Sequence, residues 1–137
     1  MPRETAGAGF IRTQCNIRFP IGAGAGLIEY QTDAILGHGF TVEKVEGFVV
    51  VAGTGAGATR LFRVLKGAAT VVASATVALA DTATVGAKVP AFTIVTADAD
   101  FLDASTLTVD SPAAGAVAYT AGELALVITL RQRTQQR

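Results

Sequence analysis

The sequence predicts an all-β protein, an antiparallel β-sandwich or jelly-roll of about eight or nine strands. Three observations favour this class. Val and Thr, whose branched Cβ favours extended backbone, are abundant. Apolar and polar residues alternate in short runs of strand period. Glycine- or proline-containing turns separate these runs about every ten to fifteen residues, as in sandwiches and small barrels.

The N-terminal runs read as strands. In FIRTQCNIRFPI, Cys15, Ile17 and Phe19 alternate with polar residues, and Pro20 suits a strand end. A GAGAG break separates this run from LIEYQT, a short strand. DAILGHG reads as a turn, and FTVEKVEGFVVVAGT as a long strand in which Gly47 suits a bulge.

The segment TRLFRVLKG is ambiguous between helix and strand. Several of its apolar residues fit helical spacing, and its basic residues fall three apart. As a strand, Phe62 and Val64 would share one face with the stems of Arg60 and Lys66. Gly67 would stop a helix after about seven residues, which decides against a long helix.

The C-terminal half continues the pattern. ATVVASATVALA reads as a strand that ends at a turn, VPAFTIVT as a strand, TADADFLDAS as an acidic turn, and STLTV as a strand followed by a turn and a short strand. The last strand places Leu124, Leu126, Ile128 and Leu130 on one face and Ala125, Val127, Thr129 and Arg131 on the other. Because both faces are fairly apolar, we expect both to be buried.

The chain of 137 residues suits one domain. We expect a flexible arm over residues 1–12, the sandwich over 13–131 and a short basic tail over 132–137. The formal net charge is zero and charged residues make up 16% of the chain. This balance gives no drive toward nucleic acid or membrane surfaces, so neither is an expected partner. Sparse charge also indicates that partners cover much of the surface.

The sequence predicts no secretion signal, membrane span or disulfide. The N-terminus MPRETAGAGF lacks the apolar core of a signal peptide, and no run of eighteen apolar residues occurs. Cys15 is the only cysteine, so an intrachain disulfide is impossible, and a buried structural role is favoured over a reactive thiol.

The stretch FVVVAGTGAGATR contains a G-x-G-x-x-A spacing at Gly53, Gly55 and Ala58, as in dinucleotide-binding turns. Such a turn requires a following helix and an acidic residue about twenty positions later. The following segment is too short for that helix, and no acidic residue lies between Glu46 and Asp81. A hairpin loop is the favoured interpretation, and a cofactor-binding enzyme is not expected.

Other candidate sites are weak. His38 is the only histidine and lacks metal-ligand spacing, so a turn residue is favoured over a catalytic or metal-binding one. Asp98, Asp100 and Asp103 could hold Ca²⁺, but Leu102 breaks the EF-hand order, and aspartates that bond their own turn are favoured. The three serines do not lie in G-x-S-x-G. We therefore predict no catalytic, cofactor or metal site.

The residues expected to contact partners lie near the two ends of the chain, because these ends read as separate from the core. They are Arg3, Phe10, Ile11, Arg12, Arg131 and Arg133. The basic tail RQRTQQR lacks interleaved aromatic residues, which favours a solvated tail or a contact to an acidic neighbouring subunit over nucleic acid.

Three features of residues 40–131 carry a family resemblance. They are the strand pattern of EKVEGFVVVAGTGAGATRLFRVLKG, the strand STLTV at 105–109, and a closing strand from Gly122 to Leu130 that is similar to a G-x-L-x-V-x-I-x-L pattern, with Leu126 in place of Val. With these motifs the segment resembles a small jelly-roll or β-sandwich domain that is common among virion proteins of tailed bacteriophages. The first forty residues carry no such pattern.

The resemblance implies a capsid decoration (cement) protein. It would be a non-enzymatic trimer that binds the major capsid protein on the outside of the virion, after synthesis in the host cytoplasm. An alternative is a receptor- or glycan-binding module of a head fibre or tail. Glycan sites usually present exposed aromatic residues, and here only Tyr30 and Tyr119 are available, with no Trp.

Overall fold

A computed structural model describes residues 10–21, 26–31, 39–55, 59–67, 69–101, 106–112 and 121–133, with only the backbone of 10, 11, 26–31, 132 and 133. These residues form nine β-strands, two 3-10 helices and no α-helix, which confirms the all-β prediction. The strands are β1 (Phe10–Pro20), β2 (Gly26–Gln31), β3 (Phe40–Thr54), β4 (Thr59–Lys66), β5 (Thr70–Ala78), β6 (Thr93–Ile94), β7 (Asp100–Phe101), β8 (Thr106–Ser111) and β9 (Ala121–Arg133). The 3-10 helices are η1 (Leu79–Thr82) and η2 (Thr96–Asp98).

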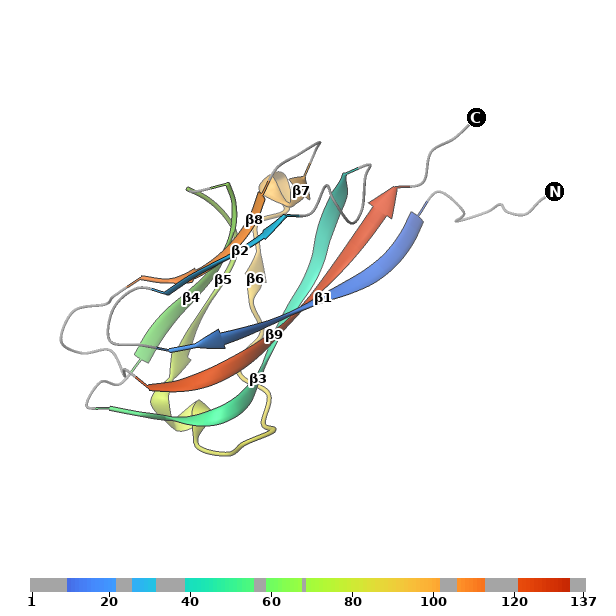
Figure 1. The fold of residues 1–137 in the computed structure, drawn as a ribbon. Coiled ribbons are helices and arrows are strands. Elements are labelled where there is room, and N and C mark those ends of the chain that lie inside the picture. The colour runs from blue at the N-terminus through green and yellow to red at the C-terminus, as the bar shows by residue number, and fades with distance from the viewer. Residues whose placement is uncertain are drawn as a thin grey trace.

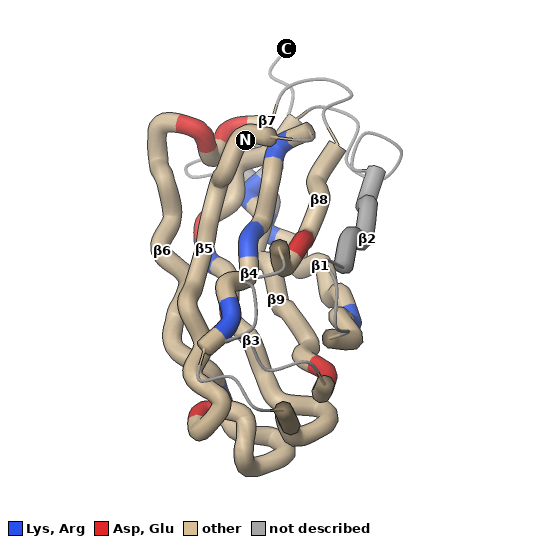
Figure 2. The backbone as a smooth tube through the Cα atoms, turned by 90° about the vertical axis from the view of Figure 1, so that its left-hand side faces the viewer, with Lys and Arg blue, Asp and Glu red and all other residues tan. Residues whose placement is uncertain are grey.

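The strands form two antiparallel sheets that pack as a sandwich (Figures 1 and 2). Sheet A has the order β1-β9-β3-β7, and sheet B the order β2-β8-β4-β5-β6. The first and last strands are neighbours along their length, from the pair Phe10 and Arg133 to the pair Pro20 and Glu123. The pairing of β1 and β9 therefore begins before residue 13 and continues after residue 131, the boundaries expected for the sandwich.

The core lies between the sheets and follows the period-2 alternation of the strands. Sheet A contributes Cys15, Ile17, Phe19, Val42, Val45, Val49, Leu124, Leu126, Ile128 and Leu130, and sheet B contributes Phe62, Val64, Val72, Val77, Leu107 and Val109. The expected inner face of the last strand is confirmed. Its other face is only half-buried, because within the described chain no second layer covers that side of sheet A.

Two aromatic pairs contribute to the packing. Phe19 of β1 and Phe62 of β4 meet edge to face across the two sheets, with ring centroids 5.8 Å apart and an interplanar angle of 87°. Phe40 and Phe101 stack within sheet A at 4.5 Å. Such pairs contribute about 0.5–1.5 kcal/mol beyond the area they bury.

The segment TRLFRVLKG is a strand, β4, in which Arg60, Phe62 and Val64 are all buried on one face. Figure 2 shows basic residues spaced along this strand. Gly67 ends it with a φ of +67°, a conformation that favours glycine. β4 and β5 then pair as neighbours in sheet B.

The prediction that GTGAGAT is a hairpin loop is wrong, because the strands on its two sides belong to different sheets. β3 pairs with β9 and β7 in sheet A, whereas β4 pairs with β5 and β8 in sheet B. The glycine-rich stretch therefore connects the two sheets. Local sequence predicts a turn but not the strand's partner, which distant residues determine. The absence of a helix after the stretch agrees with the rejection of a dinucleotide turn.

The segment VPAFTIVT forms a much shorter strand than expected, because it changes sheets. Val89 N–H donates to Gly47 O at 2.9 Å on the edge of sheet A, and six residues later Val95 N–H donates to Val72 O at 2.8 Å in sheet B. Only β6, two residues long, pairs as a regular strand. Gly47 is not the expected bulge: a Cβ there would lie 2.7 Å from Val89 Cγ2, so glycine allows this crossing segment to approach.

Candidate interaction surface

The solvent side of sheet A is here called the outer face. It carries most of the charged side chains that form ion pairs in the described chain. β1 contributes Arg12, Gln14, Asn16 and Arg18, β9 contributes Glu123, Ala125, Val127, Thr129 and Arg131, and β3 contributes Glu43, Lys44, Glu46, Phe48 and Val51. Directly opposed residues of antiparallel strands point to the same side of a sheet, which places these side chains together. Lys88 joins them through the bridge between Phe48 and Lys88.

Glu43 lies between two arginines from different strands. Arg12 Nε donates to Glu43 Oε1 at 2.8 Å, and Arg131 Nη1 lies 3.5 Å from Glu43 Oε2. The β1–β9 register places Arg12 directly opposite Arg131. In β3, Glu43 lies at a register shift between Val42 and Lys44. Side chains from the two ends of the chain and from its middle thus form one cluster.

Glu46 is held in the same way by Lys44, at 3.3 Å, and by Lys88, which contacts the same Oε2 atom. The hydrogen bond from Lys88 is the main cause that lowers the pKa of Glu46 below its ordinary value, with Lys44 adding to it. Exposed ion pairs of this kind contribute little to stability. Their main consequence is that the lysine side chains are positioned over the sheet.

On the outer face, the carboxylates are less exposed to solvent than the basic side chains that pair with them. The side chains of Glu43, Glu46 and Glu123 are 16–24% exposed. Four of their basic partners, Arg12, Arg18, Lys44 and Lys88, are 50–66% exposed, and Arg131 is 33% exposed. The outer face therefore presents positive groups to solvent, and each carboxylate beneath them is paired with at least one cation.

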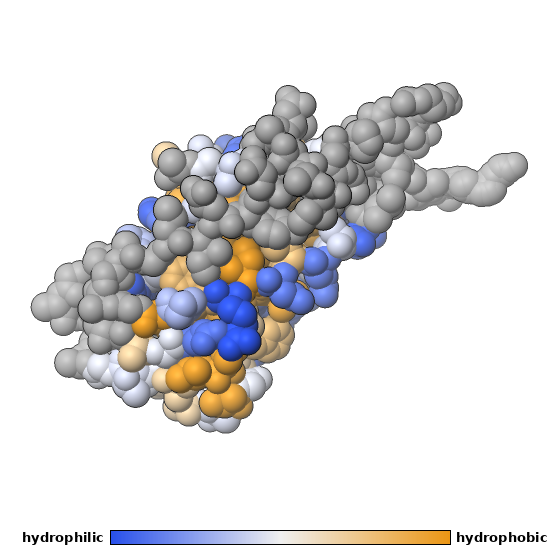
Figure 3. All heavy atoms as spheres, viewed as in Figure 1, coloured by the Kyte–Doolittle hydropathy of each residue, from blue (hydrophilic) through white to orange (hydrophobic). Residues whose placement is uncertain are grey.

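Apolar side chains interrupt these charges. Val51 is 50% exposed and lies opposite Glu123, so it belongs to the outer face. Phe48 and Val127 are half-buried on the same face. Val85, 63% exposed, precedes Gly86, whose N–H donates to Val49 O of β3. Figure 3, in the view of Figure 1, shows hydrophobic residues beside a group of hydrophilic ones. An apolar patch bordered by charge is typical of a protein-binding surface.

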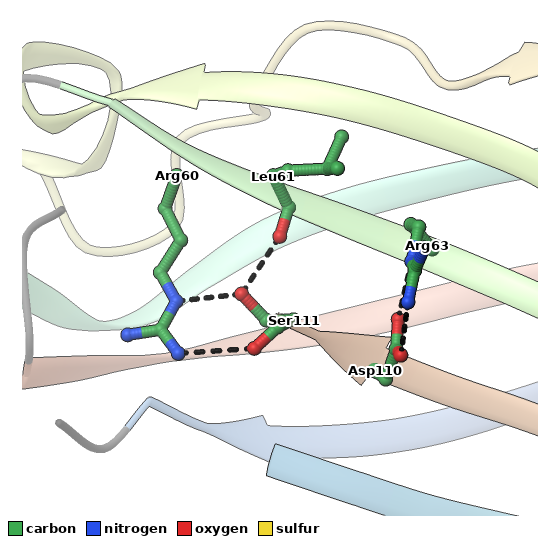
Figure 4. Close-up of polar contacts among 5 residues, drawn as sticks. All are labelled: Arg60, Leu61, Arg63, Asp110 and Ser111. Atoms are coloured by element: carbon green, nitrogen blue, oxygen red, sulfur yellow. Dashed lines mark hydrogen bonds and ion pairs between the residues drawn. The ribbon is translucent and has the colours of Figure 1, made fainter. Parts of the chain in front are cut away.

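The polar contacts of sheet B instead stabilise the fold (Figure 4). Arg60 is 1% exposed and donates from Nε to Ser111 Oγ at 2.6 Å and from Nη2 to Ser111 O at 3.1 Å. Ser111 Oγ donates in turn to Leu61 O. Arg63 and Asp110 form a two-point pair at 2.8 and 2.6 Å, which raises the pKa of Arg63. These groups join β4 to β8.

The structure brings together the predicted contact residues that it describes. Phe10 pairs with Arg133 and Arg12 with Arg131 through the backbones of β1 and β9. Arg12 and Arg131 are both ion-paired with the chain's own Glu43, so they form one cluster. The side chains of Phe10, Ile11 and Arg133 are not described, and Arg3 lies outside the described residues.

The other candidates do not form a site among the described residues. His38 and Asp103 lie outside them. Asp98 belongs to η2, and Asp100 accepts a hydrogen bond from Thr41 Oγ1 at 2.5 Å. In the part of the chain that the structure describes, no three His, Cys, Asp or Glu side chains gather as metal ligands. No helix in that part is long and apolar enough to cross a membrane.

Sequence reasoning missed the acidic centres of the outer face. Lys88 and Glu46 are 42 positions apart, and Arg12 and Glu43 are 31 apart. No local spacing reports these pairs, because the strand register brings them together. The available signal was the cluster of charges in VEKVEG within a strand otherwise rich in valine.

Comparisons with known proteins give distant similarities. No protein-family model and no curated protein matches the chain. A solved structure of Bacillus endospore appendages, described as disulfide-linked pili, has 20% identity over 92% of this chain and 89% of that chain, with a TM-score of 0.43. The extra small virus of the prawn Macrobrachium rosenbergii, solved as a virus-like particle, has 10% identity over 99% and 86%, with a TM-score of 0.42. Desmodium yellow mottle tymovirus has 8% identity over 100% and 96%, with a TM-score of 0.35. Similarities this distant carry no functional argument.

Proposed function

We propose that the chain is a non-enzymatic structural subunit of a tailed-bacteriophage virion, a decoration protein that binds the outside of the assembled capsid. The observation that carries the proposal is the composition of the outer face of sheet A. There, exposed basic side chains pair with less exposed carboxylates, and partly exposed apolar residues lie beside them. The resemblance of residues 40–131 to virion domains points the same way.

The proposed mechanism is binding and needs no chemical step. A subunit that binds the assembled lattice and not its separated parts stabilises the assembly by mass action. Many weak contacts add up when the subunit is itself oligomeric, so the trimer that the resemblance implies belongs to this proposal. The major capsid protein is the proposed partner, at the virion surface, after synthesis in the host cytoplasm.

The outer face suits a protein partner better than a nucleic acid. Its five cations are accompanied by three carboxylates, which would repel a phosphate backbone. Its apolar residues, in contrast, match the mixed composition of protein interfaces. Direct nucleic-acid binding is therefore not part of the proposal.

The test is co-sedimentation of purified chain with phage heads assembled without it. Val51→Asp places a charge in the exposed apolar part of the outer face and should weaken head binding at least about fivefold. The matched control is Val95→Asp, which changes a valine that is 39% exposed next to sheet B. The control should bind like the unchanged chain.

Two results would contradict the proposal. One is an unchanged chain that does not co-sediment with the heads. The other is equal binding by the two variants, which would place the contact elsewhere. Circular dichroism of both variants verifies that they are folded.

A further inference from the structure

One edge of sheet A lacks a neighbouring strand within the described chain. β1 is eleven residues long and stands at the end of the strand order, paired only with β9. The free side of such a strand presents unpaired backbone N–H and C=O groups, which form a template for another strand.

The opposite edge of sheet A is covered. Beyond the short β7, the segment from Gly86 to Phe92 runs along β3. Gly86 N–H donates to Val49 O at 2.7 Å, Val89 N–H donates to Gly47 O at 2.9 Å, and Val49 N–H donates to Ala87 O at 2.9 Å. The described sandwich therefore closes sheet A on the β3 side and leaves it open at β1.

The charged side chains of β1 do not guard its free edge. Charged residues commonly protect an edge strand against pairing. Here Arg12 reaches to Glu43 of β3, and Arg18 pairs with Glu123 of β9. Both arginines thus lean over their own sheet and away from the open side. The exposed amides of Gln14 and Asn16 lie between them.

We propose that β1 pairs with β1 of a second copy, antiparallel about a two-fold axis, so that sheet A continues from one copy into the next. Because the same edge is present on each copy, one self-complementary contact joins two copies and leaves neither β1 edge unpaired. Directly opposed residues of antiparallel strands point to the same face. The two-fold axis must therefore lie midway between the two copies of one residue, which oppose each other.

Charge restricts the register of this contact. An axis at Asn16 places Gln14 opposite Arg18 and Arg12 opposite Pro20, so no like charges meet. An axis one residue earlier would place Arg12 opposite Arg18, and opposed like charges destabilise a strand pair. An axis at Gln14 avoids that repulsion as well, and the proposal commits to the axis at Asn16, which pairs residues 12–20 of the two copies.

The contact does not depend on capsid binding, so its failure and that of the proposed function are distinguishable. Alone it gives a dimer with twice the 14.0 kDa mass of one chain. Combined with the proposed three-fold contact, it gives a closed assembly of six copies.

Cysteine cross-linking tests the register directly. Across the axis, the two Asn16 Cα atoms should lie about 4.5–5.5 Å apart, which suits a disulfide. Asn16→Cys should therefore form a covalent dimer under mild oxidation. Gln14→Cys is the matched control, because its two copies would lie about 14 Å apart along the strands. Cys15 is present in both variants and is buried.

Sedimentation analysis across a concentration series gives the second measurement. The unchanged chain should show an even number of copies. Asn16→Lys places two cations at the axis and should raise the dissociation constant about fivefold, whereas Asn16→Gln should leave it unchanged. A single-copy mass at every concentration, or equal cross-linking of Asn16→Cys and Gln14→Cys, would overturn the proposal.

Discussion

The contact between Phe19 and Phe62 offers the most direct test of how the two sheets pack. The rings are 1% and 0% exposed and meet edge to face with centroids 5.8 Å apart. Replacing either ring by alanine should cost about 3–5 kcal/mol, a large share of the roughly 5–15 kcal/mol that stabilises a domain. Leucine retains most of the apolar volume and removes the ring, so it is the better probe of the pair itself.

The experiment is a double-mutant cycle of Phe19→Leu and Phe62→Leu, measured by urea unfolding. The coupling free energy should be about 0.5–1.5 kcal/mol. A control cycle combines Phe62→Leu with Phe101→Leu. Lys66, which lies over the Phe101 ring, is about 13 Å along β4 from Phe62, so this cycle should be additive. Additive costs for Phe19 and Phe62 would refute the described packing.

Three further predictions concern single residues. Gly122 has a φ of +123° and an added Cβ would lie 2.9 Å from backbone of β3, so Gly122→Ala should lower the free energy of unfolding by about 1–3 kcal/mol in urea. Ser111→Ala removes the hydroxyl that accepts from Nε of buried Arg60, while the Ser111 carbonyl still accepts from Nη2, so it should lower the free energy of unfolding by about 1–3 kcal/mol; no loss would contradict a stabilising role for this hydroxyl. The lowered pKa of Glu46 stabilises the fold above the ordinary carboxyl pKa, and this contribution is lost as pH falls through the folded value. Glu46→Gln should therefore reduce the acid dependence of the melting temperature, and Lys88→Met should have the same effect.

Strand positions were predictable because they depend on local pattern. The alternation Cys15, Ile17, Phe19 in β1 and the leucine-rich face of β9 identify which side chains point inward, and the structure buries them. A period of two needs only a few consecutive residues to become visible. Sheet membership was not predictable in this way.

The stretch after β3 shows why. Its glycines predict a turn, but a hairpin and a crossing between sheets use the same turn residues. Which one forms depends on β9 and β8, whose residues lie far along the chain. VPAFTIVT similarly reads as one strand, because its backbone partners, Gly47 and Val72, belong to different sheets and leave no local trace.

The candidate surface was predictable in part. The interest in Arg12 and Arg131 came from their positions near the chain ends, and strand pairing does bring them together. Their shared partner Glu43, and the cluster of Glu46 with Lys88, depend on register across three segments. Sequence alone gives the charges but not which of them neutralise one another.

Quantitative mass spectrometry of purified particles, from the host cell in which the chain is made, tests the central claim most directly. The account predicts that the chain co-purifies with intact particles in many copies, in a fixed ratio to the major capsid protein. Particles that contain the major capsid protein and none of this chain would contradict it.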